Sequence, residues 1–285
     1  MNLLKQSIPG DANVFMAGDR HIGNPASYRK GFYKMRDMIM ATYDGLASQC
    51  NFYIDMGDII EAITLDDNRL DKEHLENYSP IVQIQMAVED YKPMADKIIC
   101  MLDGNHPAKL WRVVPDLTKH ACQQIGCPYG DYSAKVSFHD MHGNLAFKLY
   151  ATHGRRSINS NLPDPAQAWA SKQRSLKNAL RELAGDCAVM AMGHTHQLVH
   201  IEPFKRLSIT DDGVGINQEY IEQVPNANWI HPDQRFYINT GSFFRTQMVG
   251  TSTYAEKAQY TPLELGFYVL KVRNYKPVGL DRVTL

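Results

Sequence analysis

Short apolar runs recur along the chain and mark its expected strands. Most end in glycine beside a polar residue, and several are rich in β-branched or aromatic side chains, a composition typical of buried strands. The runs are 13–19 (NVFMAGD), 51–58 (NFYIDMGD), 97–105 (KIICMLDGN), 146–154 (AFKLYATHG), 187–194 (CAVMAMGH), 235–242 (RFYINTGS) and 266–272 (GFYVLKV).

The segments between these runs carry apolar residues at helical spacing. Helices are expected after Pro25 and after Pro80, and Pro80 suits a first helical turn. Another is expected over 166–183, and one more over 110–121, where Pro115 predicts a kink or an early end. The residues expected on the buried faces of the first two helices are Tyr28, Phe32, Met35, Ile39 and Leu46, then Ile81, Ile84, Val88 and Tyr91.

Strands that alternate with helices favour an α/β fold with a mainly parallel sheet covered on both faces. The stretch around His142-Gly143-Asn144 instead predicts an antiparallel hairpin, because two apolar runs flank a turn sequence. We expect one domain over 1–285, with insertions at 61–79 and 201–234. The second insertion is interpreted as a long loop or an extra hairpin.

Composition and charge exclude only a few classes of protein and partner. The 285 residues carry a formal net charge of −1, so the chain as a whole has no electrostatic preference for nucleic acid or membrane. Its five cysteines form no C-x-x-C pair, and Cys100 and Cys187 lie in apolar runs, where reduced buried thiols are expected. We therefore expect a cytoplasmic protein. The N-terminus lacks the apolar run of a signal peptide, and no stretch approaches the length of a membrane span.

Polar residues of a small set of types follow five of the expected strands. Because the loops at the carboxyl ends of parallel strands share one edge of a sheet, these side chains should converge there. They are Asp19 and His21, Asp58, Asn105 and His106, His153, and His194 and His196.

Asp, Asn and His side chains supply the oxygen and nitrogen ligands that suit Mn²⁺, Fe²⁺ or Zn²⁺. Alternate residues of an extended segment point the same way, so Asp19 and His21 can bind one ion, while His194 and His196 can serve two. Seven candidate ligands are too many for one ion that keeps a position open for water. They are Asp19, His21, Asp58, Asn105, His153, His194 and His196. The count favours a dinuclear centre, with ions about 3.5–4 Å apart and a bridging carboxylate.

In this order, the motifs GDRHIG, GDIIE, GNHP, THG and GHTH resemble those of the calcineurin-like metallophosphoesterases. The stretch 238–242 (INTGS) also resembles the N-P-G-S segment that follows them in the family. The resemblance covers residues 18–196 and implies a metallophosphoesterase-type β-sandwich flanked by helices, here with inserted loops. Unaided, the residue pattern would have suggested a single doubly wound sheet.

The resemblance also implies a role for each motif residue. One ion would be held by Asp19, His21 and His196, the other by Asn105, His153 and His194, and Asp58 would bridge them. His106 would act on the substrate as a general acid. The expected cofactors are two divalent ions, Mn²⁺ first, with Fe²⁺ and Zn²⁺ as alternatives.

The GNHP motif departs from the family at Pro107, where an Asp or Glu usually stands beside the histidine. We expect Gly104 to permit a tight turn and Pro107 to occupy the first position of a helix. The carboxylate missing at Pro107 could be supplied by Asp103. Glu61 is interpreted either as a partner of a ligand histidine or as a solvated carboxylate at a helix start.

Basic residues near the motifs are candidates for substrate contacts. Arg155 and Arg156 follow His153 directly, and a guanidinium there could bind a second phosphate or a flanking nucleotide. Alternatively, both arginines are charged side chains at the rim of the site that contact only solvent. A basic run on the expected helix at 166–183 could contact nucleic acid or simply be exposed; it consists of Lys172, Arg174, Lys177 and Arg181.

The leading hypothesis is a dinuclear-metal-dependent phosphoesterase that cleaves phosphodiesters, as a nuclease or nucleotide phosphodiesterase, by metal-activated hydroxide with His106 as general acid. One alternative is a phosphomonoesterase acting on nucleotides or phosphoproteins. Another is a non-catalytic binding scaffold, whose signature, lost metal ligands, is not found. The expected partner is a phosphate-ester substrate, nucleic acid or nucleotide among the options, and no membrane. The residue pattern leaves the oligomeric state open.

Overall fold

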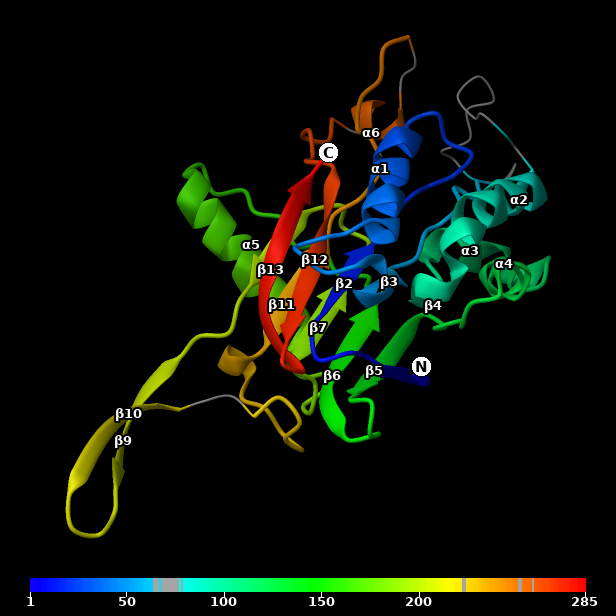
Figure 1. Cartoon of the computed structure of the whole chain (residues 1–285). Coiled ribbons are helices and arrows are strands. Elements are labelled where there is room, and N and C mark those ends of the chain that lie inside the picture. Colours follow the sequence, from blue (N-terminus) through cyan, green and yellow to red (C-terminus); the bar gives the residue numbers. More distant parts are fainter. Residues whose placement is uncertain (64–66, 68–76, 78, 222–223, 251–252, 258) are drawn as a thin grey trace.

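A computed structural model gives the fold (Figure 1). It describes residues 1–63, 67, 77, 79–221, 224–250, 253–257 and 259–285. Most of the expected insertion at 61–79 therefore lies outside the described residues.

Two mixed sheets form the centre of the molecule. The five-stranded sheet has the order β13-β12-β2-β3-β4, and the six-stranded sheet has the order β1-β5-β6-β7-β11-β8. The strands of the first are β2 (Ala12–Ala17), β3 (Asn51–Asp55), β4 (Ile98–Met101), β12 (Gly266–Arg273) and β13 (Lys276–Thr284). Those of the second are β1 (Asn2–Ser7), β5 (Ser133–His139), β6 (Leu145–Thr152), β7 (Val189–Met192), β8 (Leu198–Ile201) and β11 (Phe236–Thr240).

The sheets pack face to face, and alternation along β2 shows how. Val14 and Met16 point into the core between the sheets, where they meet residues of β5 and β6 such as Phe138. Phe15 and Ala17 point the other way, into a second core under the helices. Successive side chains of a strand face opposite sides, so a continuous apolar run serves two cores at once.

Helices cover both outer faces (Figure 1). The helices are α1 (Arg29–Met40), α2 (Pro80–Tyr91), α3 (Asn105–Ala108), α4 (Leu117–Ile125), α5 (Pro165–Leu180) and α6 (Tyr254–Lys257). α1, α2 and α4 pack on the five-stranded sheet, and α5 packs on the six-stranded sheet through Leu176 and Leu180. The expected helix-flanked β-sandwich is confirmed, whereas the single, mainly parallel sheet is wrong.

The helices begin and end near their predicted positions, with three corrections. Leu46 lies outside α1, because the chain becomes extended at Ala41. Ile81 is 61% exposed, and the buried face of α2 instead includes Gln83 and Asp90. The helix expected over 110–121 is interrupted before Asp116, whose side chain caps α4 by accepting from the backbone N–H of Lys119.

Some strands carried too weak a pattern to be predicted. β1 alternates between half-buried and exposed residues, and β13 contains both a proline and a glycine. The hairpin at β5 and β6 is confirmed. The segment 201–234 contains a hairpin of β9 (Arg206–Asp211) and β10 (Ile216–Ile221), which extends away from the sheets in Figure 1.

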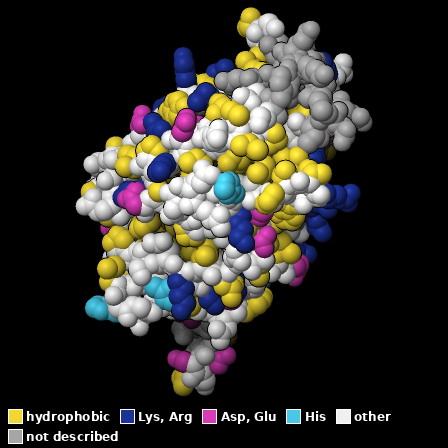
Figure 2. All heavy atoms as spheres, turned by 90° about the vertical axis from the view of Figure 1, so that its right-hand side faces the viewer, with side chains coloured by type: hydrophobic (Ala, Val, Ile, Leu, Met, Phe, Trp, Pro, Cys, Tyr) yellow, Lys and Arg dark blue, Asp and Glu magenta, His cyan; other side chains and the backbone are white. Residues whose placement is uncertain are grey.

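Two further expectations concern cysteines and surface charge. All five cysteines are free, and Cys100 and Cys187 are buried as expected. On the face that lies at the right of Figure 1, Lys and Arg side chains are interspersed with Asp and Glu rather than gathered in one patch (Figure 2).

Within the described residues, no helix is long and apolar enough to cross a membrane.

Candidate metal centre

The predicted ligands meet where strands of both sheets end. Asp19 and His21 follow β2, Asp58 follows β3, and Asn105 begins α3 just after β4. His153 follows β6, and His194 and His196 follow β7. Each sheet thus contributes to one site, because parallel strands of the two layers end on the same side of the molecule.

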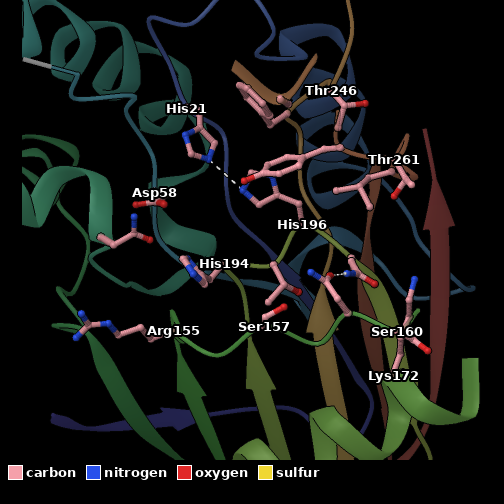
Figure 3. A pocket seen from close by; sticks show the side chains of 18 of the residues that line it. His21, Asp58, Arg155, Ser157, Ser160, Lys172, His194, His196, Thr246 and Thr261 are labelled. Carbon is pink, nitrogen blue, oxygen red and sulfur yellow. Dashed lines mark hydrogen bonds between the residues drawn. The ribbon is translucent and has the colours of Figure 1, made fainter. Parts of the chain in front are cut away.

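Asp19, His21 and His196 form the first group that can hold a cation, with ligand atoms all within 4.8 Å of one another. Nε2 of His196 lies 3.3 Å from Oδ1 of Asp19 and 3.2 Å from Nε2 of His21 (Figure 3). Oδ2 of Asp19 accepts a hydrogen bond from the backbone N–H of His194, at 2.9 Å. Because Oδ2 is engaged by the backbone, Oδ1 is the oxygen of Asp19 that faces His196.

Asp58, His153 and His194 form the second group. Nε2 of His153 is 3.3 Å from Oδ2 of Asp58 and 2.9 Å from Oδ1 of Asn105. The other oxygen of Asp58 accepts from the backbone N–H of His106, at 2.9 Å. The four side chains of the predicted second ion, Asp58 included, therefore lie together.

Hydrogen bonds to Nδ1 orient two of the histidines. Nδ1 of His21 is 2.8 Å from Oε2 of Glu61, and Nδ1 of His153 is 2.8 Å from the carbonyl oxygen of Met56. Each acceptor fixes the proton on Nδ1, so Nε2 is the nitrogen that faces the other ligands. The fully buried Glu61 stands where a partner of a ligand histidine would stand.

The backbone is strained at most of these positions. Asp19, His21, Asp58, His194 and His196 all have positive φ, between 50° and 71°. Residues other than glycine rarely adopt this conformation, and each instance costs about 1–3 kcal/mol. Five of the candidate ligands therefore lie in strained backbone.

The donor set fits divalent cations. Oδ1 of Asp19 is buried and has no hydrogen-bond partner among the described residues. Nε2 of His21 and Nε2 of His196 approach each other at 3.2 Å, although His21 already uses Nδ1 toward Glu61. Nitrogen lone pairs and a carboxylate oxygen that converge in this way require a shared proton or a cation.

The electrostatics of the site follow from its buried carboxylates. Burial alone would raise the pKa of Asp58, but the imidazoles of His153 and His106 hold that pKa well below its usual range. Burial alone would lower the pKa of His153, but the Asp58 carboxylate raises it to about 9. The buried carboxylates thus favour positive charge within the group formed by Asp58, His153 and His194.

His106 lies beside the ligands and is held by a different partner than expected. Its Nδ1 donates to the backbone carbonyl oxygen of Glu61, at 2.6 Å. Asp103 instead accepts a hydrogen bond from Thr118 through Oδ1, at 2.6 Å. The main-chain carbonyl of Glu61 is therefore the hydrogen-bond acceptor of Nδ1, and the Glu61 carboxylate lies 3.8 Å from the same nitrogen. Both leave Nε2 as the nitrogen that can exchange a proton with a substrate.

Two details of the GNHP motif also differ from expectation. Pro107 is the third residue of α3 rather than its first, a position in the first turn whose N–H would have no partner within the helix. Gly104 has an extended backbone, with φ −129° and ψ 177°, so no tight turn requires it. A glycine is needed for space, because a Cβ there would lie 1.9 Å from Oδ1 of Asp58.

We expect Gly104→Ala to weaken the site while leaving the fold intact. The added methyl group must displace Asp58, and overpacking of this kind costs about 1–3 kcal/mol. Calorimetric titration with Mn²⁺ should show weaker binding, and thermal unfolding should show a lower melting temperature. Gly10→Ala is the matched control, since its Cβ would meet Tyr275 at an ordinary 3.6 Å. Unchanged Mn²⁺ affinity in Gly104→Ala would contradict this interpretation.

A cavity of about 560 Å³ opens beside the ligands. Both Arg155 and Arg156 are exposed, but of the two Arg155 alone lines the cavity. Of the basic run on α5, Lys172 lines the cavity, whereas Lys177 pairs with Asp233 and Arg181 with Glu182.

Sequence reasoning missed other residues of the cavity. The ring of Phe244 lies 4.9 Å from that of His21 and 5.7 Å from that of His196, between ring centroids. Asn159 and Gln197 form a hydrogen-bonded pair of amides at 2.7 Å. These side chains come from loops without periodicity. The only local signal was the position of Gln197 directly after His196 in the GHTH motif.

No protein-family model and no curated protein sequence matches the chain. Among solved structures, the chain is similar to a metallophosphoesterase from Sphaerobacter thermophilus, with 12% identity, a TM-score of 0.36, and coverage of 95% of this chain and 88% of that one. It is also similar to a conserved uncharacterized protein from Streptococcus pneumoniae TIGR4, a predicted phosphoesterase, with 13% identity, a TM-score of 0.29, and coverage of 96% and 98%. At this level of similarity, the function has to be inferred from the residues of the chain itself.

Proposed function

We propose that this protein is a metal-dependent phosphoesterase that hydrolyses phosphodiester bonds. The observation that carries the proposal is that two groups of converging ligand atoms lie beside His106. His106 forms a third such group with His21 and Glu61, and the proposal assigns His106 to the substrate rather than to an ion. Asp19, His21 and His196 would hold one ion, and Asn105, His153 and His194 the other. Asp58 belongs to the second group and would bridge the ions.

When bound, two divalent ions, Mn²⁺ first, would neutralise phosphate oxygens and lower the pKa of water. The chain's own residues supply the rest. Nε2 of His106 would give its proton to the departing alcohol oxygen while Nδ1 stays bonded to the Glu61 carbonyl. Glu61 would hold the ring of His21 in its ligand orientation through Nδ1. Phe244 would exclude water from one side of the ligand histidines.

One observation favours a diester over a monoester. The cavity continues well beyond the ligand groups, which gives room for a second substituent. A proton donor such as His106 would help either ester when the leaving group is an alkoxide. A nuclease or nucleotide phosphodiesterase is the corresponding activity.

Hydrolysis of bis-p-nitrophenyl phosphate and p-nitrophenyl phosphate tests the proposal. After metal removal by a chelator, we expect no activity on either compound, and Mn²⁺ should restore turnover of the diester in preference to the monoester. A preference for p-nitrophenyl phosphate would identify a phosphomonoesterase instead. No turnover of either compound, with Mn²⁺ binding confirmed by calorimetry, would identify a binding scaffold.

A further inference from the structure

The cavity extends from the ligand groups to α5. Figure 3 shows Lys172 and Thr261 on one side of it and His21 and Asp58 on the other, with His196 between them. The volume of about 560 Å³ falls within the range of pockets that hold whole small ligands, about 300–1,000 Å³. A phosphate between the ligand groups would fill only part of this space.

The charges at the cavity wall point to an anionic group far from the ligands. Among the described residues that line the cavity, Asp58 is the only acidic one, whereas Arg155 and Lys172 are both basic. Lys172 is half-buried, and no hydrogen bond or ion pair joins it to the described part of the chain. An ammonium group at the cavity wall with no carboxylate paired to it can form a charge-assisted hydrogen bond with an anion that enters the cavity.

The wall between the ligand groups and Lys172 is polar but uncharged. Its hydroxyl and amide side chains are Ser157, Asn159, Ser160, Asn161, Gln197 and Thr261. Gln197 is 7% exposed, and its Nε2 donates to Asn159. Its Oε1 is buried and has no hydrogen-bond partner among the described residues. An unpartnered buried acceptor is unfavourable, and a hydroxyl or N–H of a ligand would supply the missing hydrogen bond.

We propose that this part of the cavity is a subsite for a nucleotide-type substituent of the substrate. In this proposal, which rests on the proposed function, one alcohol of the cleaved diester carries a second phosphate that binds Lys172. Sugar or base groups of the same substituent donate to Gln197. Hydrolysis adds water across the cleaved P–O bond, so the alcohol leaves with a proton and its second phosphate stays intact.

Inhibition of bis-p-nitrophenyl phosphate hydrolysis tests the subsite, because this substrate has no second phosphate. Thymidine 3′,5′-bisphosphate is expected to inhibit about tenfold more strongly than either thymidine monophosphate, as a charge-assisted hydrogen bond predicts. In Lys172→Met, that tenfold ratio should fall to about one, while kcat and KM for bis-p-nitrophenyl phosphate stay unchanged. Lys172→Arg should keep most of the ratio.

Arg174→Met is the matched control, because Arg174 is an exposed cation on the same helix. An equal loss of the inhibition ratio in both variants would mean that the overall positive charge of the helix, and not Lys172 in particular, attracts the bisphosphate, and it would overturn the subsite. An unchanged ratio in Lys172→Met would also overturn it. If the unmodified protein does not hydrolyse bis-p-nitrophenyl phosphate, the proposed function fails separately. Calorimetric titration with the bisphosphate and with the monophosphates then tests Lys172 directly, by the same ratio of affinities.

Discussion

Asp58→Asn is expected to lower kcat/KM for bis-p-nitrophenyl phosphate by more than about 100-fold. Substitution of groups that merely orient a ligand already costs about 10–100-fold, and Asp58 is itself a member of a ligand group, with His153 and His194. The amide retains an oxygen that can accept from the backbone N–H of His106, so the local hydrogen bond at 2.9 Å can persist. Loss of the negative charge should also reduce the number of Mn²⁺ ions bound, measured by calorimetry.

Asp186→Asn provides the control for this substitution. Asp186 is a partly buried carboxylate that pairs with Lys135 and Lys148, away from the cavity lining. We expect it to change stability but not Mn²⁺ stoichiometry or kcat/KM. A folded Asp58→Asn protein with unchanged Mn²⁺ binding and activity would rule out the bridging role.

His106→Asn is expected to lower kcat for diesters with an alkyl alcohol as leaving group by about 10²–10⁴-fold, the usual contribution of a general acid. The side-chain amide of asparagine can replace Nδ1 as donor to the Glu61 carbonyl, so the variant deletes mainly the nitrogen at Nε2. p-Nitrophenolate leaves readily without a proton, so turnover of bis-p-nitrophenyl phosphate should fall much less. The pH profile for the alkyl diester should lose its descending basic limb.

His106→Gln is the companion variant, since its amide can reach the position of Nε2 but cannot exchange a proton near neutral pH. It should resemble His106→Asn if proton donation matters. Partial recovery of activity in His106→Gln, or equal losses for both leaving groups, would mean that His106 positions the substrate and is not an acid. Mn²⁺ binding should be retained in both variants.

The sequence was sufficient to predict that Asp19, Asp58, Asn105, His153 and His194 converge. The prediction used only the ends of apolar runs and the rule that parallel strands share an edge. It could not show that two sheets contribute, because an apolar run looks the same whether a helix or a second sheet covers its outer face. Val14 and Phe15 are neighbours in one run, yet they face different cores.

Contacts made through the main chain were equally invisible. The carbonyl of Glu61 holds His106, and no residue type encodes that contact. Gly104 was expected to permit a tight turn. The structure instead requires glycine there because a Cβ would clash with the carboxylate of Asp58, which is distant in sequence. Lys172 could be seen as part of a basic helix, but helical spacing could not show which of its cations faces a cavity.

The contribution of both sheets to each ligand group has a consequence for folding. Asp19 and His21 extend from one sheet and His196 from the other, so an ion bound by all three would act as a cross-link between the two layers. Site occupancy and layer association would then be linked equilibria. An ion present at 100 times its dissociation constant would add about 2.7 kcal/mol to the stability of the sandwich. The concentration of the ion would therefore affect the stability of the folded chain as well as the occupancy of the site.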